Sequence, residues 1–189
     1  LRNFFGILPV MFAFFVPALT MRLFSEETRS GSLETLMTLP VSSADAVFGK
    51  FVSAFSFTAA MLVPTFVYAG TAFFLGDPDV GPMIGGYLGA LFLAAGFSAI
   101  GLFASSLTKN QIVAFFIAFA ICILLALIDS FLVIFPARVV GPLEFLSAGY
   151  HFQSIARGIL DTRDLLYFAS LTAFFLGLTV KALDARRAA

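Results

Sequence analysis

The sequence has no Trp, a single Cys in 189 residues and only 12% charged residues, where a typical soluble domain has about 25%. Cys122 lies inside an apolar run, so the chain cannot form an internal disulfide framework or a cysteine-rich metal site. The formal net charge is +0, with 11 basic and 11 acidic residues, and this balance leaves no basic surface for nucleic acid. A disulfide-stapled domain and a nucleic-acid-binding protein are both excluded.

The signatures of common nucleotide and catalytic sites are also missing from the sequence. It contains no G-x-x-x-x-G-K-[ST] for ATP phosphates, no H-E-x-x-H and no G-x-S-x-G. His151 has no partner at metal-ligand spacing, so we expect an interfacial side chain there and not a ligand. We predict that this chain itself has no catalytic residue, no cofactor and no metal.

Hydrophobic residues make up 60% of the chain, and 26 residues are Phe. A domain of this size cannot bury so much apolar surface, so we expect lipid to cover it. A membrane-spanning helix needs about 20 predominantly apolar residues. Such runs cover residues 4–24, 51–75, 83–107, 112–135 and 165–183. We predict an all-α integral membrane protein, with residues 1–189 forming one transmembrane domain of five spans.

Features inside these runs predict how the helices bend and pack. Pro9, Pro17 and Pro64 are tolerated in membrane helices because neighbouring groups satisfy the freed backbone, and we expect kinks there. Gly85 and Gly89 form a G-x-x-x-G motif, which lets helices approach closely in lipid. Glycine is also common in membrane helices for other reasons, so a packing role and a compositional origin both stay open.

Lys and Arg are unevenly distributed between the two sides of the predicted bundle. Seven of the 11 lie in or beside the segment after the first run, the connection at 108–111 and the C-terminal tail. Because cytoplasmic loops carry the excess of Lys and Arg, we predict a multi-pass membrane protein whose C-terminus and segment 25–50 are cytoplasmic. The first residue would then lie outside. We therefore expect an N-terminal truncation that removes one span from a six-span parent.

The predicted cytoplasmic segment 25–50 is too long for a simple turn. Ser32 can cap a short amphipathic helix, which Pro40 would end. The apolar side of that helix carries Leu33, Leu36 and Met37, and the other side carries Glu34. A capping box at Ser42 to Asp45 then starts the helix that leads into the second span. The short helix either lies on the lipid surface or docks on a partner, and the pattern does not choose between them.

The predicted external stretch 136–164 has a second amphipathic pattern. Its apolar positions at helical spacing are Phe145, Ala148, Phe152, Ile155 and Ile159, and its polar stripe is Glu144, Ser147, His151 and Ser154. We predict one helix around 143–160 that is too polar to span the membrane. It is either a re-entrant element over a translocation route or a surface cap.

Asp129 is an ionisable residue deep in the fourth run. A charged carboxylate near a membrane centre costs about 3 kcal/mol, so such a residue is a functional candidate by default. Its closeness to Pro136 also allows a position near the outer boundary, hydrated or paired with Arg138. Transport and structural roles stay open, and an ion-coupled secondary transporter that uses Asp129 is the alternative function.

Two stretches carry a resemblance to a known family. The loop from Glu26 to Pro40 reads EETRSGSLETLMTLP: an acidic pair, a Gly-Ser step, Leu-Glu, a Leu/Met run and a Pro. It resembles the signature of ABC-2 type permeases. The stretch at 150–161, YHFQSIARGILD, followed by RDLLYF at 163–168, is similar to the end of the gliding-motility-associated permease subfamily.

This resemblance implies the permease subunit of an ATP-binding cassette transporter in the bacterial cytoplasmic membrane, which moves substrate by alternating access. ATP and Mg would bind to a separate cytoplasmic ATPase subunit, and the chain would pair with a second permease subunit within membrane lipid. The helix at 143–160 would be the re-entrant element. The residues implied in coupling to the ATPase subunit are Glu26, Glu27, Gly31, Glu34 and Leu36. Neither the substrate nor the direction of transport follows from the resemblance.

Overall fold

The computed structural model describes residues 2–32, 41–76, 79–131 and 137–187, and within these ranges the secondary structure is helical with no strand. The helices are α1 (Arg2–Thr20), α2 (Ser25–Ser30), α4 (Ser43–Leu62), the 3-10 helix η1 (Val63–Thr65), α5 (Phe66–Leu75), α6 (Val80–Leu107), α7 (Gln111–Phe131), α8 (Ala137–Leu146), α9 (Ala148–Ala156) and α10 (Thr162–Arg187). The all-α prediction is confirmed.

Among the residues that the structure describes, five helical units are long and apolar enough to cross a membrane. They are Asn3–Ser30, Ser43–Leu75, Val80–Leu107, Gln111–Phe131 and Thr162–Arg187. Each coincides with one predicted run, although residues 132–135 of the fourth run lie outside the described residues. The shortest unit has 21 residues, and at 1.5 Å per residue it just covers a hydrocarbon core of about 30 Å.

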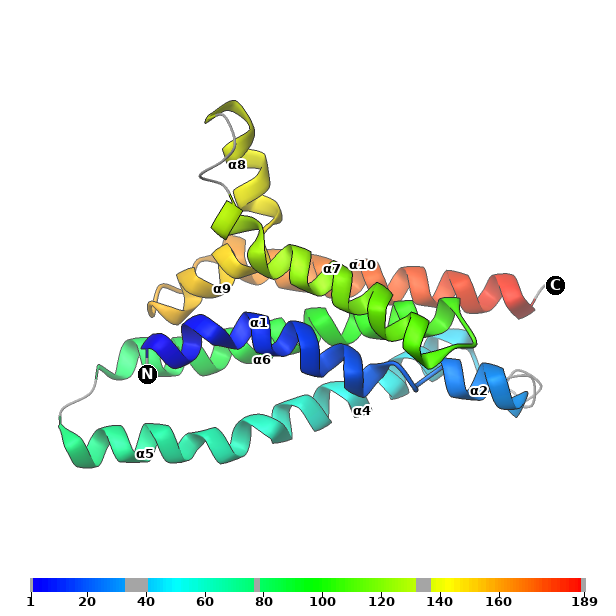
Figure 1. Ribbon diagram of the computed structural model, residues 1–189, viewed down its shortest axis with the longest axis horizontal. Helices are drawn as coiled ribbons and strands as arrows, with labels where there is room; N and C mark the ends of the chain where they lie inside the picture. Colours follow the sequence, from blue (N-terminus) through cyan, green and yellow to red (C-terminus); the bar gives the residue numbers. More distant parts are fainter. Residues whose placement is uncertain (1, 33–40, 77–78, 132–136, 188–189) are drawn as a thin grey trace.

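Helix α6 is the centre of the bundle. In its most apolar window 72% of the residues are buried, against at most 39% in any other span. Helices α1, α4, α7, α9 and α10 all pack against it (Figure 1). Its small residues permit these contacts: a Cβ on Gly85 would lie 2.1 Å from the Ile155 carbonyl oxygen, and one on Gly89 would lie 3.2 Å from the Phe152 ring. Helices α6 and α9 therefore meet at these two glycines.

The second span is interrupted at Pro64, where α4 gives way to η1 and then α5. Proline lacks the N–H that would continue the α-helical ladder. The Tyr87 hydroxyl on α6 donates to the Thr65 carbonyl oxygen at 2.8 Å and thereby fixes the interruption against the third span. Of the other two predicted kink sites, Pro9 and Pro17, both lie within α1, which stays α-helical through them.

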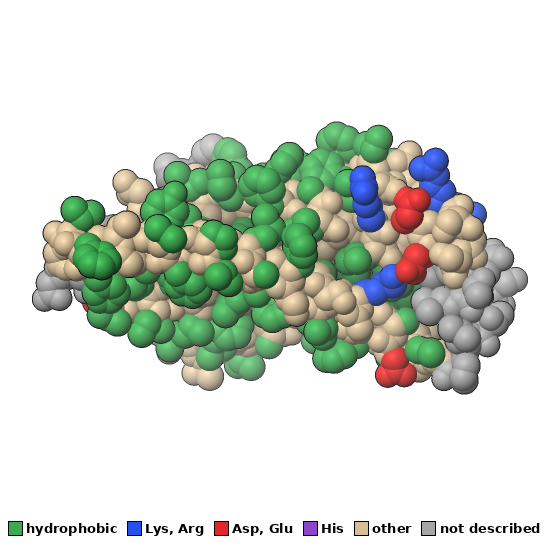
Figure 2. Space-filling view, turned by 90° about the horizontal axis from the view of Figure 1, so that it is seen from below, with side chains coloured by type: hydrophobic (Ala, Val, Ile, Leu, Met, Phe, Trp, Pro, Cys, Tyr) green, Lys and Arg blue, Asp and Glu red, His purple; other side chains and the backbone are tan. Residues whose placement is uncertain are grey.

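The antiparallel spans give the bundle two ends, which we name by the short helices found there (Figure 1). The α2 end contains α2, the start of α4, the end of α6, the start of α7 and the end of α10. The α9 end contains the start of α1, the end of α5, the start of α6, α8, α9 and the start of α10. Figure 2 shows an apolar band over most of the length, with Lys, Arg, Asp and Glu side chains gathered at the α2 end. Exposed apolar side chains on the spans include Phe14, Phe57, Phe116 and Phe174, as expected for a lipid-facing surface.

The segment predicted as one amphipathic helix around 143–160 forms two helices, so that prediction is wrong in detail. Helix α8 ends at Leu146 and α9 begins at Ala148. Between them the Ser147 hydroxyl accepts a hydrogen bond from the Tyr150 N–H at 3.1 Å. Serine is a preferred N-cap, so it starts a new helix where the apolar spacing indicated a continuous one. Phe145 is consequently 62% exposed, whereas Phe152 is fully buried.

Candidate functional site

A turn at residues 21–24 separates α1 from α2 at the α2 end of the bundle. The first N–H groups of a helix need acceptors outside it, and the residue that caps α2, Phe24, has no side-chain acceptor to offer. Ser105 of α6 supplies one: its hydroxyl accepts from the Phe24 and Ser25 N–H groups at 2.9 and 3.0 Å. The same hydroxyl donates to the Met21 carbonyl oxygen at 2.9 Å. Ser105 is fully buried, so the turn is fixed directly to the central helix.

Helix α1 reaches Ser105 because Gly101 lies one helical turn before it, on the same face of α6. A Cβ on Gly101 would lie 1.9 Å from the Thr20 hydroxyl oxygen. Thr20 is fully buried at this crossing, and its hydroxyl donates to the Val16 carbonyl oxygen at 2.9 Å. Gly101 thus sets the close approach that Ser105 then secures.

Lys50 of α4 attaches α2 to the second span. Its Nζ lies 2.5 Å from Glu27 Oε1 and donates to the Leu23 carbonyl oxygen at 2.7 Å. It also lies 5.0 Å from the centre of the Phe24 ring, within cation–π range. The Lys50 and Glu27 side chains are 19% and 32% exposed, so this pair is better shielded from water than a surface ion pair.

The C-terminal helix α10 contacts the same region. Arg186 Nη1 donates to the Thr28 hydroxyl at 3.2 Å, and Arg187 Nη1 donates to the Val41 carbonyl oxygen at 3.5 Å. A small apolar cluster joins the turn to the three spans; its buried members are Phe24, Val47 of α4, Leu102 of α6 and Leu183 of α10. Helix α2 is therefore connected by side chains to α4, α6 and α10 together.

The predicted coupling residues fall into three groups. Glu26 and Gly31 are exposed, whereas Glu27 is turned inward to Lys50. Glu34 and Leu36, with the short helix predicted around them, lie outside the described residues. Gly31 ends α2 with φ +76°, the left-handed conformation that favours glycine at a helix C-terminus. The Ser42 N-cap of α4 is confirmed, with its hydroxyl accepting from the Asp45 N–H at 3.1 Å.

Comparison with protein families matches residues 2–180 to the family described as ABC-2 family transporter protein. The chain belongs to the ABC-2 family. This match confirms the predicted ABC-2 membership, and with five apolar helices it identifies a multi-pass transmembrane transporter protein and not an ATPase. Comparison with curated proteins gives no match. Membership of the gliding-motility-associated subfamily stays a prediction from the sequence.

At the α9 end of the ABC-2 bundle, Asp129 joins α7 to α9. Its Oδ2 accepts from Gln153 Nε2 at 2.9 Å. Its Oδ1 is buried and has no hydrogen-bond partner among the described residues. Gly149 makes room for the carboxylate, since a Cβ there would lie 2.8 Å from that oxygen. The side chain of Arg138, the pairing partner considered from the sequence, lies outside the described part of the structure.

His151 is not the interfacial side chain expected from the sequence, because it is only 3% exposed. Its Nδ1 lies 2.6 Å from Asp164 Oδ1 of α10, its Nε2 lies 3.0 Å from the Phe145 carbonyl oxygen, and its ring stacks on Tyr167 at 4.1 Å. Within the described ranges, no three His, Cys, Asp or Glu side chains gather as a metal site would require. Neither this cluster nor the role of Ser105 was predicted from the sequence. The one available signal for the cluster was the stretch at 150–168 that is similar to the gliding-motility-associated permeases, because it contains His151, Asp164 and Tyr167.

Proposed function

We propose that this chain is the permease subunit of an ATP-binding cassette transporter, which moves substrate across the bacterial cytoplasmic membrane by alternating access. A separate ATPase subunit supplies the energy by binding ATP and Mg, and a second permease subunit completes the route. ABC-2 membership supports this assignment. The α2 end faces the cytoplasm in this proposal, because seven of the 11 Lys and Arg lie there.

The observation that carries the proposal is the attachment of α2 to three spans at once. An ATPase can shift an inward–outward equilibrium only through contacts that differ between the two states. A displacement of α2 acts on α6 through Ser105, on α4 through Lys50 and on α10 through Arg186. The outward surface of α2, with Glu26 and Arg29 exposed, is the docking face in this proposal.

The test compares two matched charge reversals on the full-length protein, purified from its native membrane and analysed by mass spectrometry for partners. Glu26→Lys changes an exposed carboxylate at the α2 end, and Asp161→Lys changes an exposed carboxylate at the α9 end. We expect Glu26→Lys to reduce recovery of a Walker A-containing partner at least tenfold, with Asp161→Lys close to wild type. Equal recovery with both variants, or no nucleotide-binding partner with the wild-type protein, would contradict the proposal.

The ion-coupled alternative rests on the buried Oδ1 of Asp129, which has no partner among the described residues. Asp129→Asn removes the titratable group but still offers an oxygen to Gln153. If transport is ATP-driven, the variant keeps vanadate-sensitive uptake in proteoliposomes. If transport is ion-coupled, the variant loses gradient-driven uptake, and vanadate does not affect the wild-type protein.

A further inference from the structure

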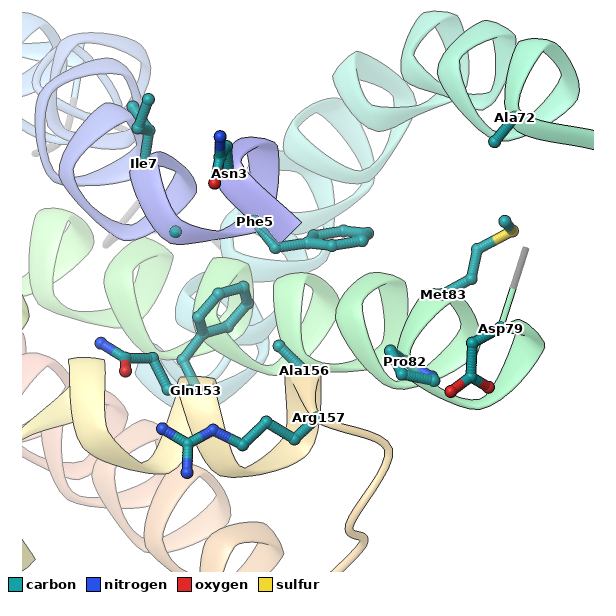
Figure 3. Close-up of a pocket in the computed structure, with 12 residues that line it drawn as sticks. Asn3, Phe5, Ile7, Ala72, Asp79, Pro82, Met83, Gln153, Ala156 and Arg157 are labelled. Carbon is teal, nitrogen blue, oxygen red and sulfur yellow. The ribbon is translucent and has the colours of Figure 1, made fainter. Parts of the chain in front are cut away.

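A cavity of about 1230 Å³ opens at the α9 end of the bundle. Four elements line it: the first turns of α1, helix α5 through Ala72, the start of α6 and helix α9. Figure 3 shows Asn3 and Ile7 of α1 on one side, Gln153 and Arg157 of α9 on another, and Asp79 and Met83 at the start of α6. Pockets for drug-sized ligands are typically about 300–1,000 Å³, so this space has room for a ligand with an apolar chain.

The inner wall of the cavity is apolar and firmly held. Phe5, Met83 and Phe152 line it, and they are 4%, 7% and 0% exposed. A Cβ on Gly6, also in the lining, would meet no atom within 4 Å, so there is open space beside this residue. The opposite wall, formed by α5, packs less closely against the rest of the bundle, because Ala69 is the one buried residue of this helix.

Two charged side chains line the cavity, Asp79 and Arg157, and Arg157 is the one that an anionic group can bind. Asp79 caps α6, with Oδ1 accepting from the Gly81 N–H at 3.2 Å, and Gln153 donates to Asp129. Arg157 is exposed, and no carboxylate of the described residues lies within 4.0 Å of its side chain. The ion pairs among the described residues are Lys50–Glu27 and His151–Asp164, and neither involves Arg157. Its guanidinium remains able to form paired hydrogen bonds with a carboxylate or phosphate.

We propose that this cavity is a binding site for an anionic amphiphile. The acidic headgroup binds Arg157, and the apolar chain packs against the lining that Phe5, Ile7 and Met83 form. Two sources share this chemistry: an acidic phospholipid of the bilayer, or a free amphiphile such as a fatty acid. The site does not depend on the proposed function, because binding to it requires neither an ATPase partner nor turnover.

The test is photocrosslinking of the full-length protein in phosphatidylcholine nanodiscs. The probes are diazirine-bearing phosphatidylglycerol, phosphatidylcholine with the same acyl chains, and a diazirine fatty acid, with labelled peptides mapped by mass spectrometry. We expect an anionic probe to label the segments around Gly6 and Arg157 at least fivefold more than phosphatidylcholine. Labelling by phosphatidylglycerol assigns the site to a bilayer lipid, and labelling by the fatty acid alone assigns it to a free amphiphile. Equal labelling by the neutral and anionic probes would overturn the proposal.

Two variants and one control separate a specific site from general charge attraction. Arg157→Gln should abolish the preference for anionic probes, whereas Arg163→Gln, an exposed arginine at the same end that does not line the cavity, should retain it. Gly6→Leu should place a side chain in the open space beside residue 6 and reduce labelling by every probe. An unchanged preference in Arg157→Gln would overturn the proposal. A photoreactive amino acid placed at position 7, in place of Ile7, gives a further check. If it crosslinks to protein, of this chain or of a second copy, and not to lipid, the proposal is overturned.

Discussion

His151 and Asp164 form a buried pair that joins α9 to α10, with Nδ1 2.6 Å from Oδ1. The other ring nitrogen, Nε2, faces the Phe145 carbonyl oxygen at 3.0 Å, and a carbonyl can only accept, so Nε2 carries a proton. Nδ1 and the carboxylate oxygen form the second hydrogen bond of the ring. The Tyr167 hydroxyl donates to the Leu146 carbonyl oxygen at 2.7 Å. The pair and the tyrosine therefore satisfy the last carbonyls of α8, which have no partners within their own helix.

This arrangement predicts different effects for two substitutions of Asp164. Asp164→Leu leaves the buried imidazole without its partner, and breaking a buried pair costs about 3–5 kcal/mol. Asp164→Asn keeps a hydrogen bond to neutral His151, so it should cost roughly 1 kcal/mol. Thermal unfolding in detergent should rank the proteins wild type, Asn and then Leu, with faster proteolysis between α8 and α9 in the Leu variant. An Asn variant as unstable as the Leu variant would contradict the hydrogen-bonding scheme.

Ser105→Ala tests whether the hydroxyl on α6 holds the α1–α2 turn. The change leaves two buried N–H groups without an acceptor, at a cost of about 1–3 kcal/mol. The matched control is Ser106→Ala, because the Ser106 hydroxyl is bonded only within its own helix, to the Phe103 carbonyl oxygen at 2.7 Å. Hydrogen exchange should accelerate at Phe24 and Ser25 in Ser105→Ala alone. Equal protection in both variants would show that the hydroxyl is dispensable.

The Lys50–Glu27 pair is suited to a double-mutant cycle with Lys50→Met and Glu27→Gln. Because both side chains are partly exposed, we expect a coupling free energy of about 1 kcal/mol that falls as salt is added. Lys50→Met should be the costlier single change, since it also removes the bond to the Leu23 carbonyl oxygen and the contact with the Phe24 ring. The cycle is read from denaturation midpoints in detergent. Equal costs for the two single variants would mean that the lysine acts only through the glutamate.

The spans could be predicted from the sequence because each depends on local composition. About 20 consecutive apolar residues specify a crossing, and Ser42 starts α4 through a contact only three residues away. The G-x-x-x-G motif of the third span indicated close helix packing, although the helix that each glycine meets could not be predicted. Such features are encoded within one or two turns of chain.

The cross-helix contacts could not be predicted because they join positions far apart in the sequence. Ser105 bonds to a residue 81 positions away, and Gln153 bonds to one 24 positions away. A polar residue in an apolar run looks the same whether it faces a pore or satisfies a neighbouring helix. His151 illustrates the point: its spacing to Glu144 and Ser154 indicated a polar surface stripe, whereas the N-cap at Ser147 turns its helix inward.

Gly101 and Gly85 of α6 lie against different kinds of atoms, a side chain in one case and the backbone in the other. This difference predicts which alanine variant a second substitution can restore to stability. In Gly101→Ala the new Cβ meets the Thr20 side chain, at 1.9 Å from the hydroxyl oxygen. In Gly85→Ala it meets the backbone, at 2.1 Å from the Ile155 carbonyl oxygen. Overpacking of this kind costs about 1–3 kcal/mol, so both variants should unfold at lower temperature. The control is Gly177→Ala on α10, where a Cβ meets nothing within 4 Å and the gain in helix propensity is at most about 1 kcal/mol.

Removing the side chain that the new Cβ meets should therefore restore stability to Gly101→Ala but not to Gly85→Ala. Thr20→Gly removes the atoms in contact with the new Cβ and should restore much of the stability lost in Gly101→Ala, measured as the difference between the double variant and Thr20→Gly alone. No side-chain change at Ile155 removes its carbonyl oxygen, so Ile155→Ala should not rescue Gly85→Ala. Rescue at both positions would mean that α9 can slide along α6. Rescue at neither would mean that α1 is held at this crossing by more than the fit between Gly101 and Thr20.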